Sequence, residues 1–198
     1  MTPFLSQIVI LLLVATSTGI LLARKWRWLI AFLSAQYAGV FLLALQHLPL
    51  GMATVKVIAG WMGAAILGMT HSSLEEERPE TLPQGRFFRL VAAGIVLLIA
   101  GTGAPFVDSL MANAGMIVSA GGMLLIGMGL IHLGVTDQPL RVTIGLMTVL
   151  AGFEVLYAAV ENSILVAALL ATITLGLALT GSYLMIASAK EENQAETI

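Results

Sequence analysis

Residues 142–160 read VTIGLMTVLAGFEVLYAAV, a run of 19 residues in which Glu154 is the single charged side chain. A helix needs about 20 mainly apolar residues to cross the hydrocarbon core of a bilayer. Further runs of this kind lie at residues 3–23, 28–46, 52–70, 90–105, 114–134 and 164–188. The sequence therefore predicts an all-α integral membrane protein with about seven transmembrane helices, and six is the alternative count.

The composition excludes several other classes of protein. Of the 198 residues, 59% are hydrophobic and 10% are charged, so the chain cannot cover itself with a polar surface as a soluble enzyme does. A net charge of −2 offers no basic surface for nucleic acid. The absence of cysteine excludes disulfides, thiolate zinc sites and cysteine-bound iron–sulfur clusters, and three scattered histidines do not suggest a haem or another metal site. We expect no cofactor, no metal and no catalytic constellation, and therefore no enzyme.

The basic residues predict the orientation. Lys56 lies inside an apolar run, and the other eight of the nine Lys and Arg residues fall in alternate connecting segments. Because basic residues concentrate in cytoplasmic loops, the N-terminus is expected outside and the C-terminus in the cytoplasm. The expected location is the inner (plasma) membrane of the cell, crossed several times. The eight residues are Arg24, Lys25, Arg27, Arg78, Arg86, Arg89, Arg141 and Lys190.

The polar breaks divide the chain into four segments. Residues 1–70 form a three-helix membrane segment, and residues 71–89, HSSLEEERPETLPQGRFFR, form an acidic cytoplasmic linker. This linker is either a solvated loop or a docking strip for a cytoplasmic partner. Residues 90–113 comprise the fourth helix and an external loop; Gly101, Gly103 and Pro105 suggest that this helix ends in irregular backbone. Residues 114–198 form a second three-helix segment with a polar tail.

Lys56 and Glu154 are ionisable residues inside predicted spans, where a charge costs at least about 2.5 kcal/mol. Both are expected in the outer half of the bilayer, where they could pair. For Lys56 the alternative is that its long side chain reaches the outer headgroups. A carboxylate on a short side chain cannot do the same, so Glu154 must be protonated, paired or beside water. We interpret Glu154 as a proton-relay residue, with Lys56 as a partner that tunes its charge.

Milder polar residues and small residues complete the candidate set. Tyr157 and Glu161 share a helix face with Glu154, although Glu161, in a tight turn, is more simply an interfacial carboxylate. Gln36, Thr172 and Thr174 are milder polar groups in other spans, and most such residues simply hydrogen-bond within a bundle. Of these, Gln36 and Thr172 are possible secondary polar groups of the site. Small residues at steps of four after Lys56 indicate close helix packing, and so does the glycine-rich stretch GGMLLIGMGLIHLG at 121–134. The residues of the first stripe are Gly60, Ala64 and Gly68.

The motifs IGL at 144–146, GFEVL at 152–156 and LGLAL at 175–179 resemble the K subunit of the membrane arm of bacterial complex I. They are also similar to its relatives in energy-converting hydrogenases and multisubunit cation/proton antiporters. In that family a Gly-x-Glu-x-Met/Leu segment carries a glutamate on the proton path, and Glu154 matches it. A second family glutamate corresponds to Thr172, so this carboxylate is missing here, and the link between the two helices is shorter.

The first half has a fainter resemblance to the neighbouring J subunit. Residues 55–67, VKVIAGWMGAAIL, are similar in pattern to its third helix, with Lys56 at a glutamine position and Gly60 at a tyrosine position. The resemblance implies a non-catalytic subunit of an ion-translocating complex, with antiporter-like membrane subunits and lipids as partners. The alternatives are a purely structural or assembly subunit and a small self-sufficient transporter.

Overall fold

The computed structural model describes residues 3–74, 85–111, 114–161 and 163–195, and all elements in these ranges are α-helices. Helices suit an apolar environment because they satisfy their backbone hydrogen bonds within one segment. Hydroxyl groups inside the spans donate to carbonyls of the preceding turn, as Thr148 does to Ile144 at 2.8 Å. The helices are α1 (Pro3–Leu22), α2 (Trp26–Ala44), α3 (Leu50–Ser73), α4 (Arg86–Leu110), α5 (Met116–Val135), α6 (Pro139–Val160) and α7 (Ile164–Ala195).

The seven helices confirm the predicted all-α membrane fold. Helices α2 to α7 are each long and apolar enough to cross a membrane, judged by length and composition. The apolar stretch of α1, Ser6–Leu22, is shorter, but α1 packs along α2 and α5 as part of the same bundle. Which end of the bundle faces the cytoplasm stays a prediction.

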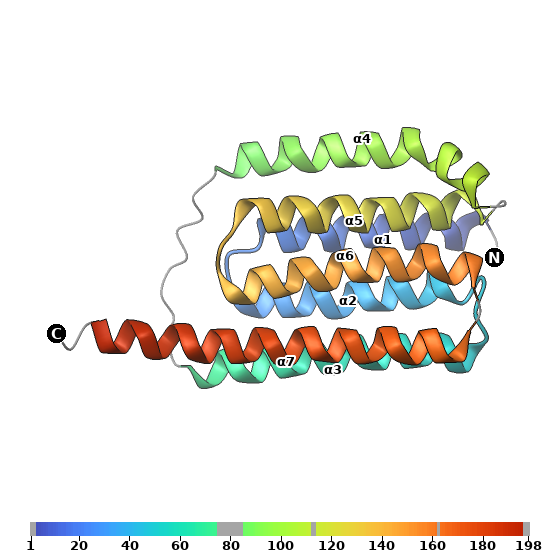
Figure 1. Ribbon diagram of the computed structural model, residues 1–198. Coiled ribbons are helices and arrows are strands. Elements are labelled where there is room, and N and C mark those ends of the chain that lie inside the picture. Colours follow the sequence, from blue (N-terminus) through green and yellow to red (C-terminus); the bar gives the residue numbers. More distant parts are fainter. Residues whose placement is uncertain (1–2, 75–84, 112–113, 162, 196–198) are drawn as a thin grey trace.

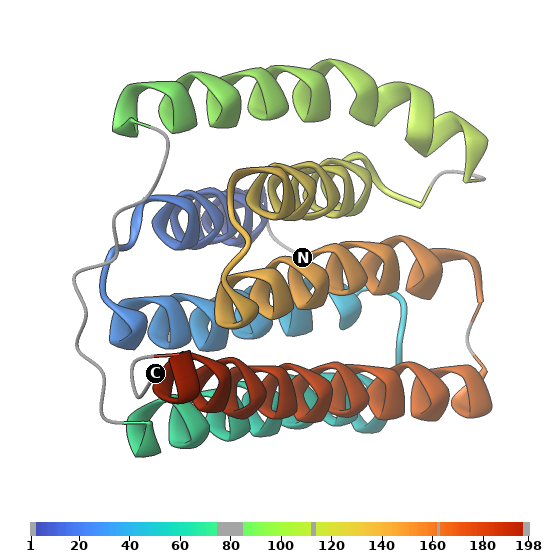
Figure 2. The ribbon, with the colours of Figure 1, turned by 60° about the vertical axis from the view of Figure 1, so that its left-hand side comes forward.

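Successive helices run in opposite directions, and six of the seven form three side-by-side pairs (Figure 1). Helix α1 lies along α5, α2 contacts α6, and α3 packs along α7 over its length. Both members of each pair run in the same direction, because three helices lie between them in sequence and successive helices alternate in direction. The two three-helix segments expected from the sequence therefore interleave into one bundle. Helix α4 stands apart on the outer side, mainly against α5 (Figure 2).

The fourth helix is longer than the sequence predicts. It begins at Arg86 within the expected linker and continues through Pro105 to Leu110, so the expectation of an irregular end is wrong. Pro105 removes a backbone donor but lies near the C-terminal end, where the helix bends rather than breaks (Figure 1). Asp108 then accepts a hydrogen bond from the Gly115 backbone N–H at 2.7 Å, which ties the end of α4 to the start of α5.

The linker expected at 71–89 is shorter in the structure. Helix α3 includes residues up to Ser73, and α4 includes Arg86 onward, while residues 75–84 lie outside the described residues. The turn predicted at 161–162 joins α6 to α7; Glu161 caps α6, and residue 162 also lies outside the described residues.

Candidate functional site

An ion pair joins α3 to α6 in the interior of the bundle. The Lys56 ammonium nitrogen lies 3.2 Å from Glu154 Oε2, and the side chains are 3% and 2% exposed. The sequence predicted both residues and suggested that they could pair, and the structure brings them together. The alternative, in which Lys56 reaches the headgroups, is wrong because its side chain points into the bundle.

Helix α7 contacts the other oxygen of the same carboxylate. Thr174 donates to Glu154 Oε1 at 3.5 Å and lies 3.0 Å from the Leu170 carbonyl. A hydroxyl has one proton, so Thr174 can donate fully to one of these acceptors at a time. Glu154 therefore connects α6 to α3 through one oxygen and to α7 through the other.

Helix α2 supplies a second set of buried polar groups. Tyr37, 1% exposed, donates to the Met147 carbonyl at 3.5 Å and also interacts with Thr174 and with the charge of Glu154. Gln36 is fully buried and donates through Nε2 to Thr148 at 3.3 Å. Its Oε1 is buried without a hydrogen-bond partner among the described residues. A buried acceptor of this kind is typical of a position where a water molecule completes the network.

Burying the Lys56–Glu154 ion pair carries a large free-energy cost. Removing two charges from water costs several kcal/mol per ion, and mutual attraction repays this only with good geometry and additional hydrogen bonds. The Lys56–Glu154 contact and the Thr174 hydroxyl provide such compensation. The site therefore holds a carboxylate in a nearly water-free region, beside one cation and one hydroxyl donor.

Three of the secondary candidates lie away from the ion pair. Tyr157 is half-buried and stacks on Phe153, with ring centroids 5.9 Å apart. Glu161 is exposed at the C-terminal end of α6. Thr172 is also exposed and donates to Ala168 within its own helix. Of the secondary group, Gln36 is the member that the structure places in the buried polar network.

Sequence reasoning gave Thr174 too little weight and did not select Tyr37 or Thr148. The sequence does place Thr174 on one helix face with the small residues Ala171 and Ala178, and the structure shows that this face of α7 is buried. The buried positions of α7 are Ala167, Leu170, Ala171, Thr174, Ala178, Gly181, Ser182 and Met185.

The small residues of α3 pack inside this chain. A side chain at Gly60 would overlap the ring of Tyr37, and Ala64 is 1% exposed. Gly68 is half-buried beside Ile30 of α2. The predicted close helix packing is therefore present at Gly60 and Ala64, where the helices of this chain cover the stripe.

The described residues contain no group of three or more His, Asp or Glu side chains that could hold a metal ion. No protein-family model matches the chain, and neither a curated protein nor a solved structure is significantly similar to it. The chain is a multi-span helical membrane protein with a buried, salt-bridged glutamate.

Proposed function

We propose that this protein is a non-catalytic membrane subunit of a multisubunit proton- or cation-translocating complex related to complex I, and that Glu154 is a protonatable group on the ion path. The observation that carries the proposal is the buried pair of Lys56 and Glu154. Ionisable residues inside membrane bundles characteristically occur on ion and proton pathways. The choice of the complex I superfamily rests on the motifs around Glu154, which resemble those of its K subunits.

The geometry suits a switchable charge. Proximity of an ammonium favours the ionised form of a carboxylate, whereas loss of water favours the protonated form. Lys56, Glu154 and Thr174 belong to three different helices, so a small displacement of one helix would change the balance. Movements in neighbouring subunits would then be coupled to uptake or release of a proton at Glu154.

A structural or assembly subunit is the second candidate. It is favoured by the fact that each charge of the buried pair is already matched by the other. Two enclosed opposite charges at 3.2 Å can hold α3 and α6 together as a static contact. A small self-sufficient transporter is the third candidate. Inverted repeats would favour it, and the two three-helix segments do not form one, because they run in the same direction.

Copurification from native membranes tests the proposed assembly. The tagged full-length chain should be recovered from the plasma membrane together with antiporter-like membrane subunits. Recovery as a lone homo-oligomer would contradict the proposal and support the transporter.

Substitution of the carboxylate tests the role of Glu154. Glu154→Gln preserves size and hydrogen bonding but cannot titrate, so it should abolish coupled ion movement. Glu161→Gln is the matched control, because it removes an exposed carboxylate from the end of the same helix. Equal ion movement in the two variants would exclude a relay role.

A further inference from the structure

Tyr37 of α2 is a buried titratable residue at the junction of four helices. Its ring fills the space beside Gly60 of α3, where a Cβ atom would overlap it, and Gly60 is one turn along α3 from Lys56. The hydroxyl of Tyr37 donates to the Met147 carbonyl of α6 at 3.5 Å and also hydrogen-bonds with Thr174 of α7. The ring is thus fixed by packing, and its hydroxyl is held beside the surroundings of the ion pair.

The two hydroxyl groups near the carboxylate have fewer protons than nearby acceptors. The single proton of Tyr37 can go to the Met147 carbonyl or to the Thr174 oxygen. The single proton of Thr174 can go to the Leu170 carbonyl at 3.0 Å or to Glu154 Oε1 at 3.5 Å. Contacts of 3.5 Å are longer than the usual O–H···O distance of about 2.5–3.0 Å, so they are weak and can be exchanged.

The charge of Glu154 decides between two arrangements of these protons. When Glu154 is ionised, Thr174 can donate to the carboxylate and Tyr37 can donate to Thr174. When Glu154 is protonated, the two hydroxyls can donate to the carbonyls of Leu170 and Met147 instead. Hydrogen bonds to an ionised acceptor are roughly twice as strong as those between neutral groups, so the first arrangement favours the ionised carboxylate.

We propose that Tyr37 is a positioning residue for Glu154: it directs the Thr174 hydroxyl to the carboxylate and thereby sets the pH at which Glu154 takes up a proton. Thr174 makes the hydrogen bond to the carboxylate, so Tyr37 acts through it. The inference rests on the proposed function, because this pH matters to ion movement only if Glu154 exchanges protons.

Other titratable side chains on the helices around Glu154, apart from its counter-ion Lys56, are remote from it. Glu161 is exposed seven residues later on α6, about 10 Å along the helix. His47 follows the end of α2, ten residues beyond Tyr37, and Tyr183 of α7 is 69% exposed. None of these positions matches that of Tyr37 beside Thr174.

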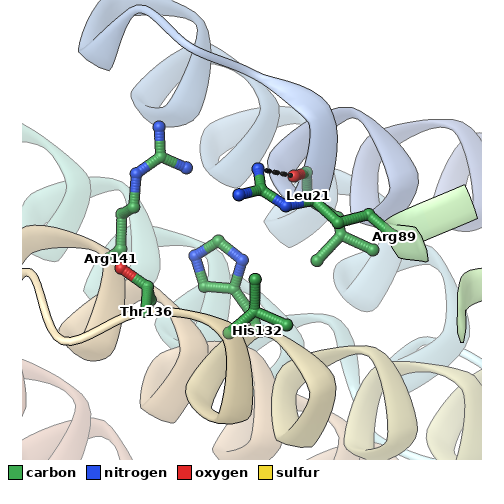
Figure 3. Close-up of a pocket in the computed structure, with 6 residues that line it drawn as sticks. Leu21, Arg89, His132, Thr136 and Arg141 are labelled. Carbon is green, nitrogen blue, oxygen red and sulfur yellow. Dashed lines mark hydrogen bonds between the residues drawn. The ribbon is translucent and has the colours of Figure 1, made fainter. Parts of the chain in front are cut away.

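A separate basic group lies at the end of the bundle where α6 begins. His132 of α5 lies there between Arg89 and Arg141, and both arginines bind carbonyls at the C-terminal end of α1 (Figure 3). Arg89 and Arg141 lie in the first turns of α4 and α6 and are 2% and 1% exposed, so the expectation that they are loop residues is wrong. Arg141 precedes Glu154 by 13 residues, about 20 Å along the helix. The charged residues at the ends of α2, α3 and α7 near this group are equally distant from the ion pair.

Infrared titration of Glu154 in the purified full-length chain tests the inference. The C=O band of its protonated carboxyl group is identified as the band missing from the Lys56→Met, Glu154→Gln double variant. Tyr37→Phe removes the hydroxyl but keeps the ring beside Gly60, so the chain should fold normally. The midpoint of the Glu154 band should rise by about one pH unit, a tenfold change in proton affinity, because the ionised form loses support from a donor.

Tyr157→Phe is the matched control, because it removes the hydroxyl of a half-buried tyrosine three residues after Glu154 on the same helix. It should leave the midpoint unchanged. Thr174→Val should raise the midpoint at least as much as Tyr37→Phe does. Adding Tyr37→Phe to Thr174→Val should change it little further, because Tyr37 acts through the threonine.

An unchanged midpoint in Tyr37→Phe, an equal shift in Tyr157→Phe, or additive shifts in the variant that also carries Thr174→Val would overturn the inference. These outcomes leave the proposed function standing, because that fails instead if Glu154→Gln moves ions as fast as Glu161→Gln. A Glu154 band that appears at no pH at which the chain stays folded would overturn both, because the ion pair would then be static.

Discussion

Gly122 of α5 and Gly152 of α6 lie backbone to backbone. A Cβ atom on Gly152 would lie 2.7 Å from the Gly122 carbonyl oxygen and 2.8 Å from the Ile126 nitrogen. Seven residues along each helix the contact recurs, where a Cβ atom on Gly129 would lie 2.9 Å from the Gly145 carbonyl oxygen. Two glycine pairs thus set the closest helix contact, and Gly152 precedes Glu154 by two residues. This contact fixes the position of the carboxylate within the bundle.

Gly152→Ala should destabilise the protein by about 1–3 kcal/mol, because the added methyl group meets backbone atoms that cannot rotate away. The measurement is thermal unfolding of the purified chain in detergent. Gly176→Ala in α7 is the control, because a Cβ atom there meets nothing within 4 Å. An unchanged melting temperature in Gly152→Ala would mean that α5 and α6 are not in backbone contact at Gly122 and Gly152.

Thr174→Val should lower stability by about 1 kcal/mol, because it removes a hydroxyl donor to a buried carboxylate while keeping the side-chain shape. Thr172→Val changes an exposed residue two positions earlier and should alter stability by less than about 0.5 kcal/mol. Thermal unfolding of the two variants side by side measures the difference. Equal losses would show that the hydroxyl–carboxylate contact contributes nothing.

Ala64→Leu should destabilise the isolated chain by about 1–3 kcal/mol, because its position in the core has no room for a larger side chain. Its neighbour Ala65 is exposed, so Ala65→Leu should leave the isolated chain as stable as the wild type. A normal melting temperature for Ala64→Leu combined with a loss of partner subunits would place this surface at an interface instead.

The membrane topology is tested by short tags. Tags at residue 2 and within residues 106–112 should react with impermeant reagents from outside the cell, and tags at residues 80 and 195 should not. The basis is the gathering of the described basic residues other than Lys56 at one end of the bundle. Residues 2 and 195 both found in the cytoplasm would contradict a seven-helix topology.

Hydropathy and charge were sufficient to predict the helix number and the two principal polar residues, because each apolar run is long enough to be recognised by itself. The glycine pattern at 121–134 predicted close helix packing, and the structure confirms it at Gly121, Gly122, Gly127 and Gly129 but not at Gly134. What the sequence could not show is which helix covers which face. Thr172 and Thr174 look alike in sequence, yet one faces outward and the other meets Glu154, and this depends on the rotation of α7 in the bundle.

The same reason explains why the sequence did not predict the burial of Arg89 and Arg141. Counting Arg89 and Arg141 as loop charges was adequate for orientation, since both lie close to helix ends. Their burial beside His132 depends on the arrangement of α1, α4, α5 and α6, which no single segment specifies. Tyr37 was overlooked for a similar reason, because its neighbour Gly60 is on another helix.

Substitution of both members of the ion pair distinguishes a proton relay from a static internal contact most directly. Glu154→Gln alone leaves Lys56 buried without its counter-ion, which should cost about 3–5 kcal/mol in either case. Adding Lys56→Met removes the remaining charge and should restore stability and assembly. Ion translocation by the Lys56→Met, Glu154→Gln double variant is then measured in inverted membrane vesicles with a pH-sensitive dye, with Glu161→Gln as the control. The relay account predicts a stable, assembled complex that no longer moves ions; an assembled double variant that translocates ions at the wild-type rate would contradict it.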